Sequence, residues 1–158
     1  MMSRLKFYQE NFMLKIAIVC SRFNDTITNA LFEGTKARLL ELGLSPEQIY
    51  ATFVPGAIEI PIMTQKLAQS QKFAAIIALG VVIRGETSHY DYVCSQVSDG
   101  CLRVSLDEGI PVIFGVLTTE NESQALERLS DKDHKGRYCA EAALEIIENI
   151  EKVHLLQQ

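Results

Sequence analysis

Residues 74–92 read AAIIALGVVIRGETSHYDY and carry the clearest indication of the fold. Its apolar part, residues 74–83, ends at Arg84 and falls well short of the roughly 20 apolar residues that cross a membrane. A continuous apolar run indicates a strand covered on both faces, which is typical of a parallel sheet. We therefore predict a buried strand over residues 74–79, followed by a polar segment at its carboxyl end.

Three further apolar runs, residues 16–20, 49–54 and 112–117, predict three more strands. Apolar residues at helical spacing predict helices over residues 27–42, 57–72 and 122–129, and apolar stripes within residues 93–104 and 138–150 predict two more. Asn24, Asp25 or Thr26 can cap the first helix, Asn121 can cap the fourth, and Gly136 can separate the last two. Strands that alternate with helices imply right-handed crossovers and a three-layer α/β/α sandwich around a four-stranded parallel sheet.

The composition fits one globular domain. The chain has 158 residues, 47% of them hydrophobic and 22% charged, and its net charge of −5 argues against nonspecific nucleic-acid binding. We assign residues 15–154 to the domain and residues 1–14 to an N-terminal arm. Leu5, Phe7 and Tyr8 are too apolar for a free tail, so we expect the arm to add to a neighbouring subunit.

The cysteines and the first residues bear on location and metal binding. The four cysteines form no CxxC pair and no histidine lies at zinc-ligand spacing, so we expect reduced thiols and no metal site. Arg4, Lys6 and Glu10 interrupt any apolar leader, so we expect no secretory signal. With no apolar span, these features predict a cytoplasmic protein that does not bind a membrane.

Open parallel sheets bind ligands beyond the carboxyl ends of their strands, so the residues that follow each predicted strand are the candidate site. These segments are residues 21–25, 55–59, 80–90 and 118–121. Each carries polar or conformationally special residues, and four segments that converge on one edge are stronger evidence than any one of them.

The third segment is the richest in candidate chemistry. Gly85, Glu86 and Thr87 precede a predicted helix whose free amides can bind an anion, and ordinary capping by Thr87 or Ser88 is the alternative. His89 lies in the first turn, where the helix dipole favours a neutral imidazole that can take or give a proton. The alternative for His89 is a structural histidine bonded to a carbonyl group.

The other candidate residues have a structural interpretation, and some of them also have a functional one. Phe23 can stack on a planar heterocycle or seal the sheet edge, and Glu59 can bind a polyol or only stabilise its helix. By default Phe114 packs in the core and Lys135 is a turn lysine. Arg128, about two turns into the fourth helix, is by default solvated, although a guanidinium also suits phosphate.

Four strings of this sequence resemble the lumazine synthase family. They are SRFN at residues 21–24, VPGAIEIP at 54–61, GVVIRGETSHYDYV at 80–93 and PVIFGVLT at 111–118. The resemblance covers residues 15–150, and Arg128 and Lys135 fall where that family has further basic residues. Together the motifs are highly specific, and they imply a sheet of flavodoxin-like order.

The resemblance implies an activity. Members condense 5-amino-6-(D-ribitylamino)uracil with 3,4-dihydroxy-2-butanone 4-phosphate to 6,7-dimethyl-8-ribityllumazine in riboflavin biosynthesis, releasing phosphate and water without a cofactor. The resemblance makes His89 the proton-transfer residue. The implied pyrimidine and ribityl contacts are Phe23, Asn24, Ala57, Ile58, Glu59, Val81, Val82, Ile83, Phe114 and Lys135. The implied phosphate contacts are Gly85, Glu86, Thr87 and Arg128.

The resemblance also implies an assembly. Members form homopentamers with sites at subunit interfaces, where Phe114 would reach the adjacent site, and the short turn at residues 130–134 favours an icosahedral capsid. Riboflavin synthase is the implied protein partner. The alternative function is a non-catalytic flavin-binding or shell-forming paralogue. A receiver-type signalling domain shares the strand order, but it needs acidic residues after the first and third strands, where SRFN and GVV stand.

Overall fold

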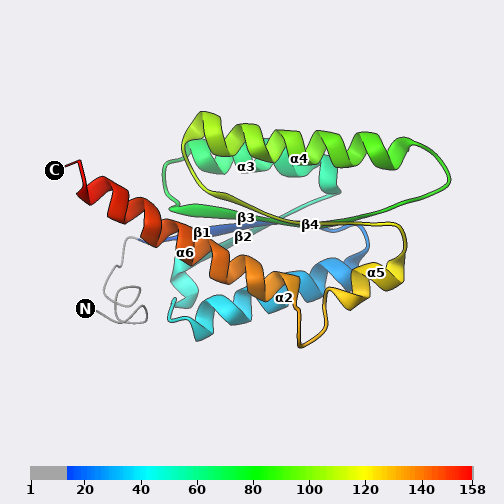
Figure 1. The fold of residues 1–158 in the computed structure, drawn as a ribbon, viewed down its shortest axis with the longest axis horizontal. Coiled ribbons are helices and arrows are strands. Elements are labelled where there is room, and N and C mark those ends of the chain that lie inside the picture. Colours follow the sequence, from blue (N-terminus) through cyan, green and yellow to red (C-terminus); the bar gives the residue numbers. More distant parts are fainter. Residues whose placement is uncertain (1–13, 158) are drawn as a thin grey trace.

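The structure, a computed structural model, describes residues 14–157 (Figure 1). The predicted N-terminal arm lies outside the described residues, apart from Leu14. The elements in chain order are β1 (Ile16–Ser21), α2 (Asp25–Glu41), η1 (Pro46–Gln48), β2 (Ile49–Val54), η2 (Ala57–Glu59), α3 (Ile60–Gln69), β3 (Ala75–Ile83), α4 (His89–Glu108), β4 (Val112–Thr119), α5 (Glu122–Glu127) and α6 (Lys135–Leu155).

The four strands form one parallel sheet of order β2-β1-β3-β4. Helices α3 and α4 cover one face, and α2, α5 and α6 cover the other (Figure 1). The predicted three-layer α/β/α sandwich of flavodoxin-like order is therefore confirmed. Because all strands are parallel, their carboxyl ends lie at the same edge of the sheet, where the loops into α2, η2, α4 and α5 begin.

The core consists of two hydrophobic clusters, one on each face of the sheet. Ile16 and Ile18 of β1 pack with the α2 and α6 side chains, whereas Ala17 and Val19 pack with α3 and α4. Both faces of the central strands are buried, which explains the continuous apolar runs in β1 and β3. The edge strand β2 is only half buried, so apolar and polar residues mix in it.

Three of the four cysteines lie in these clusters as small buried side chains. Burial raises the pKa of the Cys20 and Cys101 thiols to about 12, so they stay protonated at neutral pH. Across residues 14–157, every helix is too short or too polar to span a lipid bilayer.

Two helix predictions were wrong in detail. The helix expected over residues 57–72 is divided into η2 and α3, and it stops at Gln69 before Gln71 takes a positive φ of 57°. Helix α5 ends at Glu127, so Arg128 is its C-cap rather than a residue inside a longer helix. Asn121 does cap α5, because its Oδ1 accepts a hydrogen bond from the Gln124 amide at 2.9 Å.

The sequence suggested that Gly136 separates the last two helices, but it does not. It is the second residue of α6, where that helix crosses α2. A Cβ atom at Gly136 would lie 2.8 Å from Thr35 Oγ1 and would also collide with the Leu31 carbonyl oxygen. Glycine is therefore required here for close approach of two helices, not for a chain reversal.

Candidate active site

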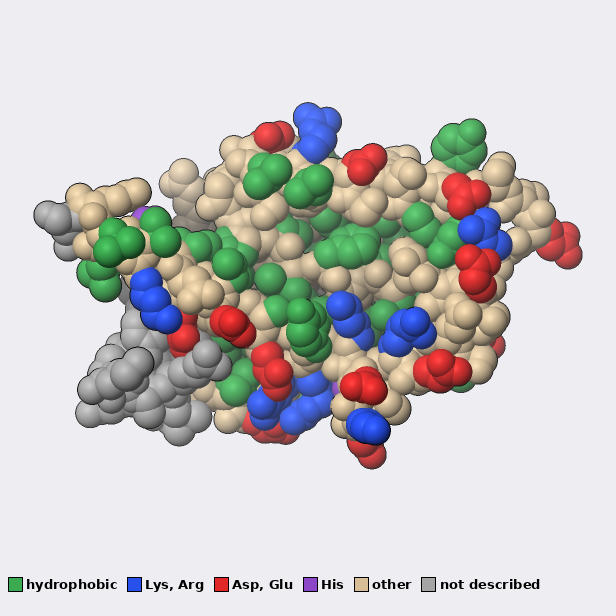
Figure 2. Space-filling view, viewed as in Figure 1, with side chains coloured by type: hydrophobic (Ala, Val, Ile, Leu, Met, Phe, Trp, Pro, Cys, Tyr) green, Lys and Arg blue, Asp and Glu red, His purple; other side chains and the backbone are tan. Residues whose placement is uncertain are grey.

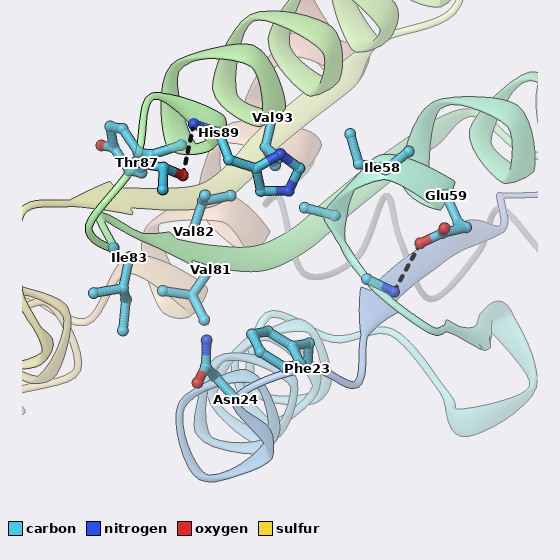
Figure 3. Close-up of a pocket in the computed structure, with 14 residues that line it drawn as sticks. Phe23, Asn24, Ile58, Glu59, Val81, Val82, Ile83, Thr87, His89 and Val93 are labelled. Carbon is cyan, nitrogen blue, oxygen red and sulfur yellow. Dashed lines mark hydrogen bonds between the residues drawn. The ribbon is translucent and has the colours of Figure 1, made fainter.

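A cavity of about 320 Å³ opens at the carboxyl ends of β1, β2 and β3 (Figure 3). Three of the four predicted strand-end segments converge on it, while residues 118–121 contribute no lining side chain. Its lining residues are Phe23, Asn24, Gly56, Ala57, Ile58, Glu59, Val81, Val82, Ile83, Gly85, Thr87, His89, Tyr90 and Val93. The end of β3 forms the apolar wall, and polar groups come from the loops around it.

Phe23 and Asn24 form one side of the cavity, opposite Val81 and Val82 (Figure 3). The loop is fixed because the Phe23 amide donates to the Pro55 carbonyl at 3.1 Å. The Phe23 side chain is 70% exposed, so its ring can receive a ligand. Asn24 has a left-handed backbone, and its carbonyl, rather than its side chain, accepts from the Ile27 and Thr28 amides in the first turn of α2. The expected side-chain cap is therefore absent, and the Asn24 amide group faces the cavity (Figure 3).

Glu59 lies at the opposite end of the cavity from Asn24 (Figure 3). Its Oε2 accepts a hydrogen bond from the Gly56 amide at 2.9 Å, which closes η2 and fixes the carboxylate. The carboxylate has lone pairs left for a ligand, because one backbone donor occupies only part of its acceptor capacity. The stabilising role and the binding role foreseen for Glu59 are thus compatible.

The amino end of α4 completes the cavity. His89 is the first residue of this 20-residue helix, and its ring points towards Ile58 and Val82 (Figure 3). Thr87 Oγ1 accepts a hydrogen bond from the His89 amide at 3.3 Å, whereas the N-cap residue Ser88 makes no side-chain cap. A Cβ atom at Gly85 would meet nothing within 4 Å, so a ligand can approach this loop closely.

Arg84 forms a charged cluster beside the cavity. Its guanidinium contacts Glu120 at 2.7 Å and Asp91 at 3.2 Å and lies over the Tyr90 ring, 4.3 Å from its centroid. The hydrogen bond to Glu120 is the main reason why the pKa of Arg84 rises above its ordinary value. Burial and the neighbouring Cys94 raise the pKa of the Tyr90 hydroxyl. Arg84 is therefore paired with protein carboxylates.

Four predicted site residues do not line this cavity. Phe114 is half buried in β4 and packs against the cluster beneath α3 and α4. Arg128 is exposed and donates to the Gln124 carbonyl at 2.7 Å. Lys135 begins α6, with its Nζ 4.8 Å from the Tyr138 ring centroid, and Glu86 is exposed outside the lining.

Three lining residues were not among the predicted site residues, namely Gly56, Tyr90 and Val93. Gly56 lies in a strand-end segment that the sequence did single out. Val93 follows His89 by one turn of α4, so helical spacing from His89 could have identified it. Tyr90 lies at the end of the strand-end segment 80–90 that the sequence also singled out, but spacing alone did not predict its contact with Arg84.

The fold and the cavity together define a class of protein, an α/β domain that binds a small molecule at the carboxyl edge of a parallel sheet. The profile of the family described as 6,7-dimethyl-8-ribityllumazine synthase matches residues 13–151. Two proteins named 6,7-dimethyl-8-ribityllumazine synthase, from Coxiella burnetii strains CbuG_Q212 and RSA 493 / Nine Mile phase I, are each 45% identical over 91% of this chain and 96% of their own length. The chain therefore belongs to the 6,7-dimethyl-8-ribityllumazine synthase family. These similarities give no support to the non-catalytic alternative.

Proposed function

We propose that the cavity is an active site in which this chain, a transferase of riboflavin biosynthesis, condenses 5-amino-6-(D-ribitylamino)uracil with 3,4-dihydroxy-2-butanone 4-phosphate. The product is 6,7-dimethyl-8-ribityllumazine, and phosphate and water leave. The observation that carries the proposal is the convergence of Phe23, Glu59, Thr87 and His89 on one cavity. Membership of the lumazine synthase family supports the choice of substrates.

The pyrimidine occupies the half of the cavity next to Phe23. The exposed Phe23 ring stacks on the flat heterocycle, and Val81, Val82 and Ile83 cover its other side. The ribityl hydroxyls reach Ala57, Ile58 and Glu59, where the oriented carboxylate accepts hydrogen bonds. This division explains why the cavity has an apolar wall and a polar end.

The sugar phosphate occupies the half next to α4. Backbone amides of Gly85, Glu86 and Thr87 at the positive end of the helix bind its phosphate. Among the described residues that line the cavity, however, none is a lysine or an arginine. A leaving phosphate dianion calls for a cation, and Arg128 of a neighbouring copy supplies it in our proposal.

The condensation needs orientation and proton transfer. Holding both substrates in one cavity replaces a bimolecular encounter, and such orientation supplies about 7–11 kcal/mol. His89 moves protons during imine formation, loss of phosphate and ring closure. Its ring lines the cavity from the first residue of α4, and an imidazole group can both accept and give a proton.

The proposed assembly is a homopentamer with shared sites, which closes into an icosahedral shell. Figure 2 shows apolar side chains gathered in the band between α4 and α6, over the β4 edge. Exposed large apolar side chains on these helices include Leu102, Leu106, Tyr138 and Ile146. An exposed apolar edge of this kind favours burial against another copy, which would bring Phe114, Arg128 and Lys135 to the adjacent cavity.

We propose a cytoplasmic location and riboflavin synthase as the partner that consumes the product.

The test of the function is the fluorescence of the lumazine product when the protein meets both substrates. Since the chain has no Trp, its own emission interferes little. Product that forms with both substrates, and with neither alone, supports the proposal. A folded protein that gives no product above the uncatalysed rate overturns it.

Shared sites have a separate test. In our proposal the variants His89→Ala and Arg128→Ala damage opposite sides of one interface site. Refolding them together in equal amounts leaves about one interface in four intact and raises the rate above the mean of the two variants. A mixture that only averages the two rates contradicts a shared site, whatever the activity of the wild-type protein.

A further inference from the structure

The segment that carries the proposed phosphate site has little packing of its own. Residues 85–89 are all exposed, and a Cβ atom at Gly85 would meet no atom within 4 Å. Within this segment, the Thr87 hydroxyl accepts a hydrogen bond from the His89 amide at 3.3 Å. A segment that must present amides and an imidazole to a substrate therefore needs support from its ends.

Arg84 supplies this support at the end of β3. Its amide donates to the Thr119 carbonyl at 2.9 Å, and its Nε donates to Glu120 Oε2 at 2.7 Å, so both contacts hold it to the end of β4. Its two terminal nitrogens contact both oxygens of Asp91 at 3.2 and 3.4 Å. Asp91 is in the first turn of α4, so one guanidinium bridges the two ends of the segment.

The Tyr90 ring lies beneath the same guanidinium, 4.3 Å from its carbon to the ring centroid. Tyr90 lines the cavity, so the contact joins the charged cluster to the wall of the site. Each exposed ion pair alone contributes little. A planar fork that holds two carboxylates and stacks on a ring is more specific, and lysine cannot reproduce it.

We propose that Arg84 is a positioning residue that sets the β3–α4 segment for the sugar phosphate, by linking the end of β4 to the first turn of α4. The inference rests on the proposed function of the cavity. Arg84 is not itself a phosphate ligand, because Asp91 and Glu120 already take up its donors. Its loss therefore weakens phosphate binding through the position of Thr87 and His89 and leaves the pyrimidine half unchanged.

The test compares Arg84→Lys with Arg103→Lys. Both keep the charge, and Arg103 is an exposed arginine on the far part of α4 with a 3.8 Å contact to Asp107, so it is the matched control. We expect Arg84→Lys to raise KM for the sugar phosphate about fivefold while KM for the pyrimidine stays within about twofold. Arg103→Lys leaves both unchanged. Adding Asp91→Asn to Arg84→Lys costs less than the sum of the two single variants, since both break one contact.

Several outcomes would overturn the inference. They are an unchanged KM for the sugar phosphate in Arg84→Lys, an equal rise for both substrates, or full additivity with Asp91→Asn. A variant that unfolds is excluded by its thermal transition, and Asp91→Asn alone then repeats the KM comparison. Failure of the proposed function is distinguishable, because the wild-type protein would then form no product at all.

Discussion

Replacing His89 by alanine tests how much of the rate at the proposed site comes from proton transfer and how much from orientation of the substrates. The ring projects into the cavity from the first residue of α4, is exposed, and makes no side-chain hydrogen bond to any residue in the range 14–157. General acid–base groups contribute roughly 10²–10⁴-fold, and we expect the lower end because no partner orients this ring. His89→Ala should therefore lower kcat about 10²-fold, or about 2.7 kcal/mol of transition-state stabilisation. The cavity walls that orient the substrates remain.

The assay is lumazine fluorescence under saturating concentrations of both substrates. His154→Ala is the control, because His154 is an exposed histidine near the end of α6, and its rate should equal that of the wild-type protein. Complete inactivity of a folded His89→Ala would mean that the chemistry depends on covalent or obligatory proton transfer through this ring. An unchanged rate would remove His89 from the mechanism.

Three further predictions concern particular side chains. Gly136→Ala should destabilise the chain by about 1–2 kcal/mol in urea unfolding, because overpacking against Thr35 exceeds the gain in helix propensity. Gly85→Ala should not destabilise the chain, because a Cβ atom at Gly85 meets no atom within 4 Å. His134 Nδ1 accepts a hydrogen bond from the Gly136 amide, and burial lowers the pKa of His134 from its ordinary value of 6.5. The neutral ring therefore contributes fully to the free energy of unfolding above pH 6.5, and this contribution is lost as the pH falls through the lowered pKa of the folded state. His134→Asn should therefore lose less stability on acidification below pH 6.5 than the wild-type chain, and equal losses would refute this. Phe23→Leu should raise KM for the pyrimidine about fivefold with little effect on the sugar phosphate, and equal shifts would reject stacking.

The sequence predicted the sheet well for a physical reason. Strands covered on both faces are apolar throughout, so β1 and β3 were visible as continuous runs, and the polar ends of the strands marked the site edge. Gly136 was misinterpreted because a glycine at a helix crossing and a glycine at a helix end look alike in sequence. Only the position of α2 against α6 distinguishes them.

The candidate site was predictable from the residues alone where the ends of neighbouring strands bring side chains together. Phe23, Glu59 and His89 follow strands of the same sheet, so the parallel topology alone brings them together. Phe114 and Arg128 do not line this cavity in their own chain, and the residues that another copy would contribute in our proposal cannot be identified from periodicity or spacing alone. The Arg84 cluster was equally hidden, because it depends on Glu120 from a distant segment.

Binding of the pyrimidine next to Phe23 can be measured directly because this chain has no Trp. Phe23→Trp places a single indole at the mouth of the cavity, and Tyr50→Trp places one on β2, where Tyr50 is 49% exposed and lies outside the cavity lining. Titration with the ribitylaminouracil should quench the emission of Phe23→Trp saturably and leave that of Tyr50→Trp unchanged after correction for absorbance. Equal responses of the two variants, in a protein that forms lumazine, would contradict binding of the pyrimidine in this cavity.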